Sequence, residues 1–235
     1  MIRPLPPAHR AALSILALAA PLAAEPVKIA IVGDSTVCDY PLDTPNRGWG
    51  MFIADYFDDS VKVVNLAASG RSTKTFLAEG RWARTLAEKP AIVLIQFGHN
   101  DSHAKDKPEA TDAATDYSAN LRRYIDEARA AGAVPVLITP MHRRTWNPDG
   151  TLYDTLQPYA DAMKAVGAEK SVRVIDLHAM SRELYLRLGE KACMDFANAE
   201  GDRTHFDEKG ARTMAELVMG KLPGAVPQLK PRLKR

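Results

Sequence analysis

The chain has 235 residues, enough to bury a core without disulfide bonds, and its 46% hydrophobic and 26% charged residues are ordinary for one soluble α/β domain. The formal net charge of +2 is concentrated at the two ends. Arg3 and Arg10 account for two positive charges and the segment after Gly220 for five, which leaves residues 25–220 with a net charge of −5. Because nucleic-acid-binding proteins carry their basic residues on the folded domain, this distribution argues against that class.

The chain begins with a segment typical of a secretory signal peptide. Arg3 and Arg10 precede the apolar run AALSILALAAPLAA, which ends in small residues just before Glu25. The run is short for a membrane-spanning helix. Cleavage after Ala24 and cleavage after the small-x-small triplet at 17–19 both remain open. We expect residues 1–24 to be a signal peptide and the mature protein to be secreted or periplasmic, without a membrane anchor.

Short apolar segments alternate with helical patterns along the rest of the chain. In chain order we expect a strand at 27–33, a helix near 47–58, a strand at 61–66, a helix near 74–88, a strand at 91–97, a helix at 112–131, a strand at 134–139, a helix near 153–169, a strand at 172–177, and helices near 179–189 and 207–219. The strands are apolar throughout, as in a parallel sheet that is covered on both faces. With neither a linker nor a repeat, the pattern predicts one α/β domain, residues 25–220: a three-layer α/β/α sandwich with a five-stranded parallel sheet.

The C-terminal segment 221–235 is expected to be a basic, flexible tail. It contains five basic residues and no acidic ones, and three prolines interrupt it.

Cys38 and Cys193 are the only cysteines. They could pair in an oxidising compartment, but two separate thiols fit the sequence equally well.

Four polar motifs lie where such a sheet binds its ligands, after strands or before the last helix. They are GDST (33–36), NLAASGRST (65–73), GHND (98–101) and DRTHF (202–206). Each has an ordinary structural explanation by itself. Ser35 and Asn100 can satisfy their own turns, and Gly70 can serve only to allow a positive φ.

Together these motifs supply the groups that acyl transfer needs. Ser35 is the candidate nucleophile, His205 the base that takes its proton, and Asp202 the acid that orients the imidazole. The backbone N–H groups of Ser35 and Gly70 and the side-chain amide of Asn100 are candidate donors to the oxyanion. We expect no cofactor and no metal in this reaction.

The order Gly-Asp-Ser, Gly, Gly-x-Asn-Asp and Asp-x-x-His resembles the SGNH (GDSL-type) hydrolase superfamily, from residue 31 to about 210. Ser35, Gly70, Asn100 and His205 match its four name-giving residues. The resemblance implies a flavodoxin-like SGNH hydrolase fold. The segments GDSTVCDY, RGWG (47–50), NLAASGRSTKTF, IQFGHND and DRTHFDEKGA are similar to the rhamnogalacturonan acetylesterase branch. That branch implies a serine esterase that removes O-acetyl groups from pectin-like plant polysaccharide through an acetyl-enzyme. We expect the protein to be a monomer.

The loop TPMHRRTWNPDG (139–150) holds candidate substrate-binding residues. Arg143 and Arg144 could pair with uronate carboxylates, and Trp146 could stack on a sugar ring. A solvated loop with a packed tryptophan is the alternative.

The same motifs are compatible with several other functions. A lipase or thioesterase of the same fold acting on short acyl esters, and an esterase for acetyl xylan or another acetylated sugar, remain alternatives. A non-catalytic carbohydrate-binding module is disfavoured because the complete set of catalytic residue types is present. His99 and His103 lack an obvious third ligand for a metal, and His178 is expected to be structural. The GxSxG motif of α/β-hydrolases is absent.

Overall fold

The computed structural model describes Met1 and residues 25–234. The expected signal peptide lies outside these residues, apart from Met1. Five strands, β1 (Val27–Gly33), β2 (Val61–Asn65), β3 (Ile92–Gln96), β4 (Val134–Ile138) and β5 (Arg173–Ile175), form one sheet in the order β2-β1-β3-β4-β5, with every pair parallel. This is the flavodoxin-like strand order. The predicted five-stranded parallel sheet is confirmed.

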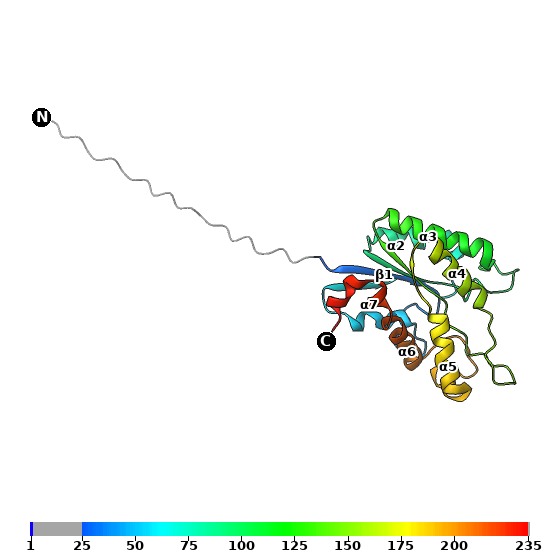
Figure 1. The fold of residues 1–235 in the computed structure, drawn as a ribbon. Helices are drawn as coiled ribbons and strands as arrows, with labels where there is room; N and C mark the ends of the chain where they lie inside the picture. The colour runs from blue at the N-terminus through cyan, green and yellow to red at the C-terminus, as the bar shows by residue number, and fades with distance from the viewer. Residues whose placement is uncertain (2–24, 235) are drawn as a thin grey trace.

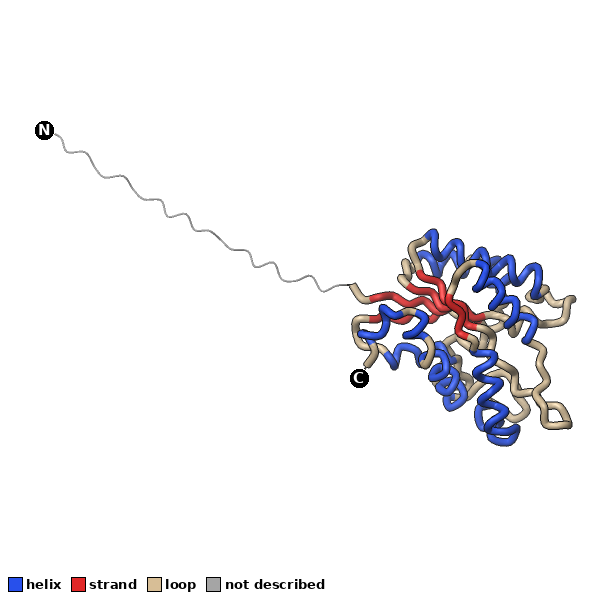
Figure 2. The backbone as a smooth tube through the Cα atoms, viewed as in Figure 1, coloured by secondary structure: helices blue, strands red, loops and turns tan. Residues whose placement is uncertain are grey.

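Helices cover both faces of the sheet (Figure 1). One face packs against α1 (Thr73–Ala78), α2 (Arg81–Ala87), η2 (Ala113–Tyr117), α3 (Ser118–Ala130) and α4 (Gln157–Glu169). The other packs against η1 (Trp49–Tyr56), α5 (Leu177–Cys193), η3 (Met194–Phe196) and α6 (Glu208–Met219). Ile29 and Ile31 of β1 point into one apolar cluster, and Ala30 and Val32 into the other. The inner strands β1, β3 and β4, among the strands in the middle of Figure 2, are therefore buried on both faces over most of their length, as their apolar runs predict.

The helices differ from the sequence prediction at specific positions. The helix expected at 74–88 is divided between α1 and α2 at Gly80, whose φ of +67° is left-handed. The segment at 47–58 forms a 3-10 helix rather than an α-helix. The helix expected from 153 begins at Gln157, because Asp154 lies in the preceding turn and accepts hydrogen bonds from the backbone N–H groups of Leu156 and Gln157.

The segment predicted to be a flexible tail is folded. Residues 222–232 form α7 (Leu222–Ala225) and η4 (Pro227–Arg232), and Leu222, Val226 and Leu229 are buried in the cluster beneath α6. The Lys234 N–H then donates to the Tyr56 carbonyl at 2.9 Å. The prediction of a flexible tail rested on the basic charges and the prolines. It was wrong because Leu222, Val226 and Leu229 are apolar and pack into the core.

Cys38 and Cys193 are separate, buried thiols. Burial raises the pKa of each thiol to about 11, so both are protonated at neutral pH.

No helix within residues 25–234 is long and apolar enough to cross a membrane.

Candidate active site

The four polar motifs meet at the carboxyl ends of the strands. Ser35 follows β1, Gly70 follows β2 and Asn100 follows β3, while Asp202 and His205 lie in the loop that precedes α6. Hydrogen bonds join these loops directly. The Ala68 N–H donates to the Gly33 carbonyl at 2.9 Å, and the Asn100 amide donates to the Arg71 carbonyl at 3.1 Å. The neighbouring strands β2, β1 and β3 therefore bring the predicted nucleophile and oxyanion donors together, and the loop before α6 brings the base to them.

Ser35, His205 and Asp202 form a continuous hydrogen-bonded line. Ser35 Oγ lies 3.0 Å from His205 Nε2, and His205 Nδ1 lies 2.8 Å from Asp202 Oδ2. An ionised Asp202 requires the ring proton on Nδ1, which leaves Nε2 free to accept the serine proton. Ser35 is 6% exposed and the His205 side chain is 38% exposed, so the line runs from the interior to the surface.

Asp202 is held in its ionised form by its own loop. Its Oδ1 accepts the backbone N–H groups of Thr204 and His205, each at 2.7 Å. Burial alone would raise the pKa of Asp202, but these two N–H groups and the His205 ring outweigh burial and lower the pKa below its ordinary value. The carboxylate can therefore orient the imidazole and stabilise its protonated form.

The three candidate oxyanion donors come from three neighbouring loops. Gly70 is exposed and has a φ of +77°, a conformation that favours glycine. Within residues 25–234, no acceptor takes up the backbone N–H of Ser35 or of Gly70. Asn100 is 8% exposed, and one of its two amide hydrogens is used by Arg71. The arrangement leaves two backbone N–H groups and one amide hydrogen for a ligand.

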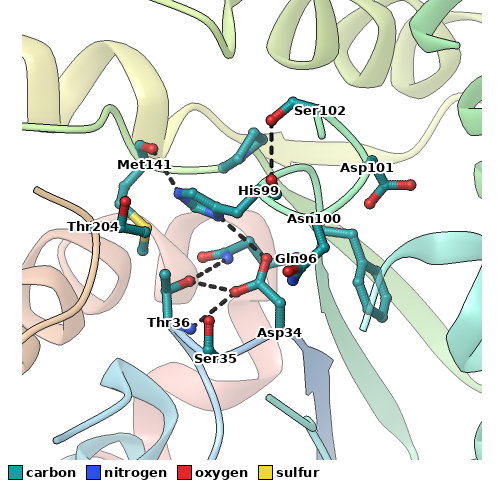
Figure 3. A network of polar contacts seen from close by, with 12 residues as sticks. Asp34, Ser35, Thr36, Gln96, His99, Asn100, Asp101, Ser102, Met141 and Thr204 are labelled. Atoms are coloured by element: carbon teal, nitrogen blue, oxygen red, sulfur yellow. Dashed lines mark hydrogen bonds and ion pairs between the residues drawn. The ribbon is translucent and has the colours of Figure 1, made fainter. Parts of the chain in front are cut away.

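A buried polar network fixes the turn that carries Ser35 (Figure 3). Oδ1 of Asp34 accepts the backbone N–H of Thr36 at 2.9 Å and its hydroxyl at 2.7 Å. Gln96 donates to the Thr36 hydroxyl at 2.9 Å and accepts the indole N–H of Trp49 at 2.7 Å. Oδ2 of Asp34 lies 3.2 Å from His99 Nδ1. Burial alone would raise the pKa of Asp34, but His99 and the hydrogen bonds from Thr36 outweigh burial and lower this pKa below its ordinary value.

The loop of Gly70 is anchored by Asp101. This buried carboxylate accepts the Thr73 hydroxyl at 2.5 Å, the Thr73 backbone N–H at 3.1 Å and the Thr111 hydroxyl at 2.9 Å. Burial outweighs these hydrogen bonds and raises the pKa of Asp101 to about 7. Thr73 is the first residue of α1, so Asp101 connects the loop after β3 to the loop after β2.

The candidate substrate-binding residues have different environments. Arg144 is fully buried. It donates to the carbonyls of His205 at 2.7 Å and Asp202 at 3.3 Å, and its guanidinium lies 4.6 Å from the centre of the Phe206 ring. The prediction that Arg144 binds substrate was wrong, because its guanidinium is enclosed beneath the loop that carries Asp202 and His205 (the catalytic loop).

Arg143 and Trp146 are partly exposed. Arg143 donates to the Thr204 hydroxyl at 2.5 Å and to the His99 carbonyl at 3.0 Å, which places it beside the catalytic loop. Trp146 packs against the larger apolar cluster, and its indole N–H is buried without a hydrogen-bond partner among the described residues. Substrate binding by these two residues stays a prediction.

Sequence reasoning missed the partnership of His99 with Asp34. His99 also places Nε2 3.1 Å from the Met141 carbonyl, whereas His103 lies 2.6 Å from Glu109 near the surface. The two histidines therefore have separate partners. The available signal was that Asp34 and His99 each directly follow a glycine at the end of a predicted strand.

Residues 31–213 match the GDSL-like Lipase/Acylhydrolase family. The chain is 41% identical over 196 residues to the probable rhamnogalacturonan acetylesterase YesY of Bacillus subtilis, covering 81% of this chain and 89% of that protein. It is 37% identical over 210 residues to the rhamnogalacturonan acetylesterase RhgT of the same organism, covering 83% and 88%.

Solved structures have the same fold. The crystal structure of the Bacillus subtilis protein YxiM superposes with a TM-score of 0.72 at 27% identity, over 88% of this chain and 56% of that one. An acetylxylan esterase from Geobacillus stearothermophilus superposes with a TM-score of 0.67 at 21% identity, over 84% and 94%.

Proposed function

The chain is a carboxylic ester hydrolase of the GDSL-like lipase/acylhydrolase family, and we propose that it removes O-acetyl groups from a pectin-like plant polysaccharide of the rhamnogalacturonan type. The observation that carries this proposal is the 41% identity to a probable rhamnogalacturonan acetylesterase across most of both chains. The line from Ser35 to His205 to Asp202 supports it, because that geometry suits acyl transfer to a serine.

In the proposed reaction, Ser35 Oγ attacks the acetyl carbonyl while its proton passes to His205 Nε2. The negative oxygen of the tetrahedral intermediate receives hydrogen bonds from the Ser35 and Gly70 N–H groups and from Asn100. The intermediate collapses, the bond to the sugar oxygen breaks, and His205 returns the proton to the departing hydroxyl group. Water, deprotonated by the same imidazole, then releases acetate and restores Ser35.

The substrate side of the proposal rests on Arg143. Its guanidinium lies against Thr204 and close to the carboxylate of Asp202, so a positive charge adjoins the catalytic loop. A uronate carboxylate next to the acetylated sugar could pair with it. A neutral xylan chain offers no such group.

The test compares acetate release from acetylated rhamnogalacturonan, acetylated homogalacturonan and acetylated xylan at equal acetyl content. We expect release from rhamnogalacturonan to be fastest, and Ser35→Ala to abolish release from all three. Faster release from xylan would contradict the proposed substrate.

Chain length separates an acetylesterase from a lipase of the same fold. We expect p-nitrophenyl acetate to be hydrolysed much faster than p-nitrophenyl octanoate. The opposite preference would assign the protein to the lipase alternative.

We also propose that residues 1–24 are a signal peptide, that the mature protein is exported, and that it is a monomer. N-terminal sequencing of protein recovered from the exported fraction tests the cleavage, and light scattering tests the oligomeric state. A mature chain that still begins at Met1 would contradict the export proposal.

A further inference from the structure

Three potential metal ligands converge in a place that the proposed reaction does not use. His142 lies in the loop after β4, Asp154 in the turn before α4, and His178 in the first turn of α5. Nε2 of His178 lies 2.9 Å from Asp154 Oδ2, and Nε2 of His142 lies 3.2 Å from the same oxygen. One ligand atom from each residue falls within 4.8 Å of the others. Three segments that are separate in sequence therefore aim a nitrogen or an oxygen at one point.

The other nitrogen of each imidazole is already committed as a donor. His142 Nδ1 lies 2.6 Å from the Arg143 carbonyl, and His178 Nδ1 lies 3.1 Å from the Pro140 carbonyl. A carbonyl can only accept, so both Nδ1 atoms carry the proton. Both Nε2 atoms are aimed at Asp154 Oδ2, and each can bind a cation once it carries no proton of its own. A second ring nitrogen that donates to a backbone carbonyl is the usual arrangement of a metal-binding histidine.

His142 Nε2 is the unsatisfied atom of this cluster, whereas His178 Nε2 has a hydrogen-bond partner in Asp154 Oδ2. The His142 side chain is fully buried, and its Nε2 has no aligned hydrogen-bond partner among the described residues despite its distance of 3.2 Å from Asp154. His178 is 3% exposed. A divalent ion at the centre of this cluster would take both Nε2 atoms and the carboxylate oxygen as ligands and would give the buried His142 Nε2 a partner.

Asp154 is oriented for this role. Its Oδ1 accepts the N–H groups of Leu156 at 2.9 Å and Gln157 at 3.0 Å, and this leaves Oδ2 for the histidines. Its side chain is 21% exposed. It lies on a pocket of about 500 Å³ whose lining also includes Lys164 and Arg182. Lys164 is paired with Asp161 at 2.9 Å and Asp176 at 3.5 Å. An ion could reach Asp154 and His178 from solvent through this pocket, and a water molecule could enter with it as a further ligand.

We propose that His142, Asp154 and His178 form a binding site for a divalent transition-metal ion of the Zn²⁺ type. Zinc binds imidazole nitrogen and carboxylate oxygen at about 2.0–2.2 Å in a tetrahedron. Ligand atoms in such a tetrahedron are about 3.3 Å apart, which follows from those bond lengths. The two contacts to Asp154 Oδ2, at 2.9 and 3.2 Å, are close to this separation.

The site would act as a structural clip. The loop that carries His142 also carries Arg143 and Arg144, which hold the catalytic loop at Thr204, Asp202 and His205. A metal would fasten that loop to α4 and α5. No proposed ligand belongs to the Ser35–His205–Asp202 line, so the ion stabilises the protein and takes no part in acetyl transfer.

The experiment measures Zn²⁺ binding to purified protein from which metal has been removed with a chelator. We expect calorimetry to give one Zn²⁺ per chain and the Tm to rise with Zn²⁺ concentration. Asp154→Asn keeps the two hydrogen bonds of Oδ1 and removes the anionic ligand, and it should weaken binding at least about 100-fold. His178→Ala should do the same. His103→Ala, which removes an exposed histidine beside Glu109, and His205→Ala should bind as the unmodified chain does.

A spectroscopic measurement on the unmodified chain guards against variants that fail to fold. Co²⁺ in place of Zn²⁺ should give the visible absorption of a four-coordinate ion, and Zn²⁺ should displace it. The proposal is overturned if the unmodified chain binds neither ion. It is equally overturned if folded Asp154→Asn and His178→Ala retain full affinity, or if His205→Ala alone loses it.

Discussion

Nδ1 of His99 lies 3.2 Å from Oδ2 of Asp34, so the residue before the candidate nucleophile is buried against an imidazole from the neighbouring strand's loop. His99 Nε2 faces the Met141 carbonyl at 3.1 Å (Figure 3). His99 therefore connects the Ser35 turn to the loop after β4. It is a positioning residue, since it acts on the reaction through Asp34.

We expect His99→Ala to lower the free energy of unfolding by about 3 kcal/mol, because it leaves the buried Asp34 carboxylate without one of its partners. Turnover should fall while KM changes little, since the serine turn loses its support but the substrate contacts remain. Urea unfolding and steady-state kinetics measure the two effects. His103→Ala is the control and should change the free energy of unfolding by less than about 0.5 kcal/mol. If the His99→Ala protein is as stable and as active as the control, His99 has no positioning role.

Ser35→Ala should reduce turnover of p-nitrophenyl acetate at least about 10⁴-fold, because no nucleophile remains. Asp202→Asn should cause a loss of about the same order, since an amide cannot hold the proton of His205 on Nδ1 as the carboxylate does. Initial rates and mass spectrometry of a trapped acyl-enzyme check both. Ser60→Ala, at an exposed turn, serves as the control. Turnover that survives Ser35→Ala would place the nucleophile elsewhere.

Asn100→Ala should lower kcat about 10²–10³-fold with a small change in KM, because the amide donates to an oxygen that becomes negative only during the reaction. Separate kcat and KM values for an activated acetate ester test this. A change confined to KM would mean that Asn100 binds the ground state and not the oxyanion.

The raised pKa of Asp101, about 7, predicts a pH dependence of stability. Between about pH 4 and pH 7 the folded chain keeps a proton that the unfolded chain releases, so this group makes the folded state less stable as pH rises. Across this pH range the contribution of Asp101 lowers the free energy of unfolding by about 4 kcal/mol in total. Asp101→Asn carries no such proton. The stability difference between the original chain and the variant should therefore shift in favour of the variant between pH 5 and pH 8.

Urea midpoints at the two pH values measure this difference. The pKa values of Asp34 and Asp202 are lowered, so these groups lose their stabilising effect only in the acid range. Both groups are present in both proteins, so their effects cancel in the difference. Equal pH slopes for the two proteins would show that Asp101 is ionised throughout.

Arg144→Met should lower the free energy of unfolding by about 2 kcal/mol, because the carbonyls of Asp202 and His205 lose a buried charged donor while the methionine fills much of the space. Turnover should also fall, since the catalytic loop is less firmly held. Thermal unfolding and kinetics check this against Arg123→Met, an exposed control on α3. A loss of affinity for substrate alone would restore the original prediction of a substrate-binding role.

The strands and the polar motifs were predictable because they depend on local patterns. A continuous apolar run such as 92–95 is typical of a strand buried on both faces of a parallel sheet, and a glycine followed by polar residues after a strand marks the ligand end. The helix boundaries were less predictable. Gly80 divides one expected helix, and Asp154 delays another through contacts of its side chain with the next turn.

The sheet, the chain order of the site and the residue types that suit acyl transfer were predictable from the amino-acid sequence, because they follow from hydrophobic periodicity and from chemistry. Which side chains meet depends on how the chain folds in three dimensions. Ser35 and His205 are 170 residues apart, and they come within 3.0 Å because Arg144 and the bridge between Arg47 and Phe206 hold the loop before α6 against the end of the sheet. The charges of Arg144 and of the C-terminal segment suggested exposure to solvent. Both are nevertheless packed, because Phe206 covers the Arg144 guanidinium and the apolar residues of the C-terminal segment join the core. The convergence of His142, Asp154 and His178 is of the same kind, since three separate connections must fold before their ligand atoms face one another.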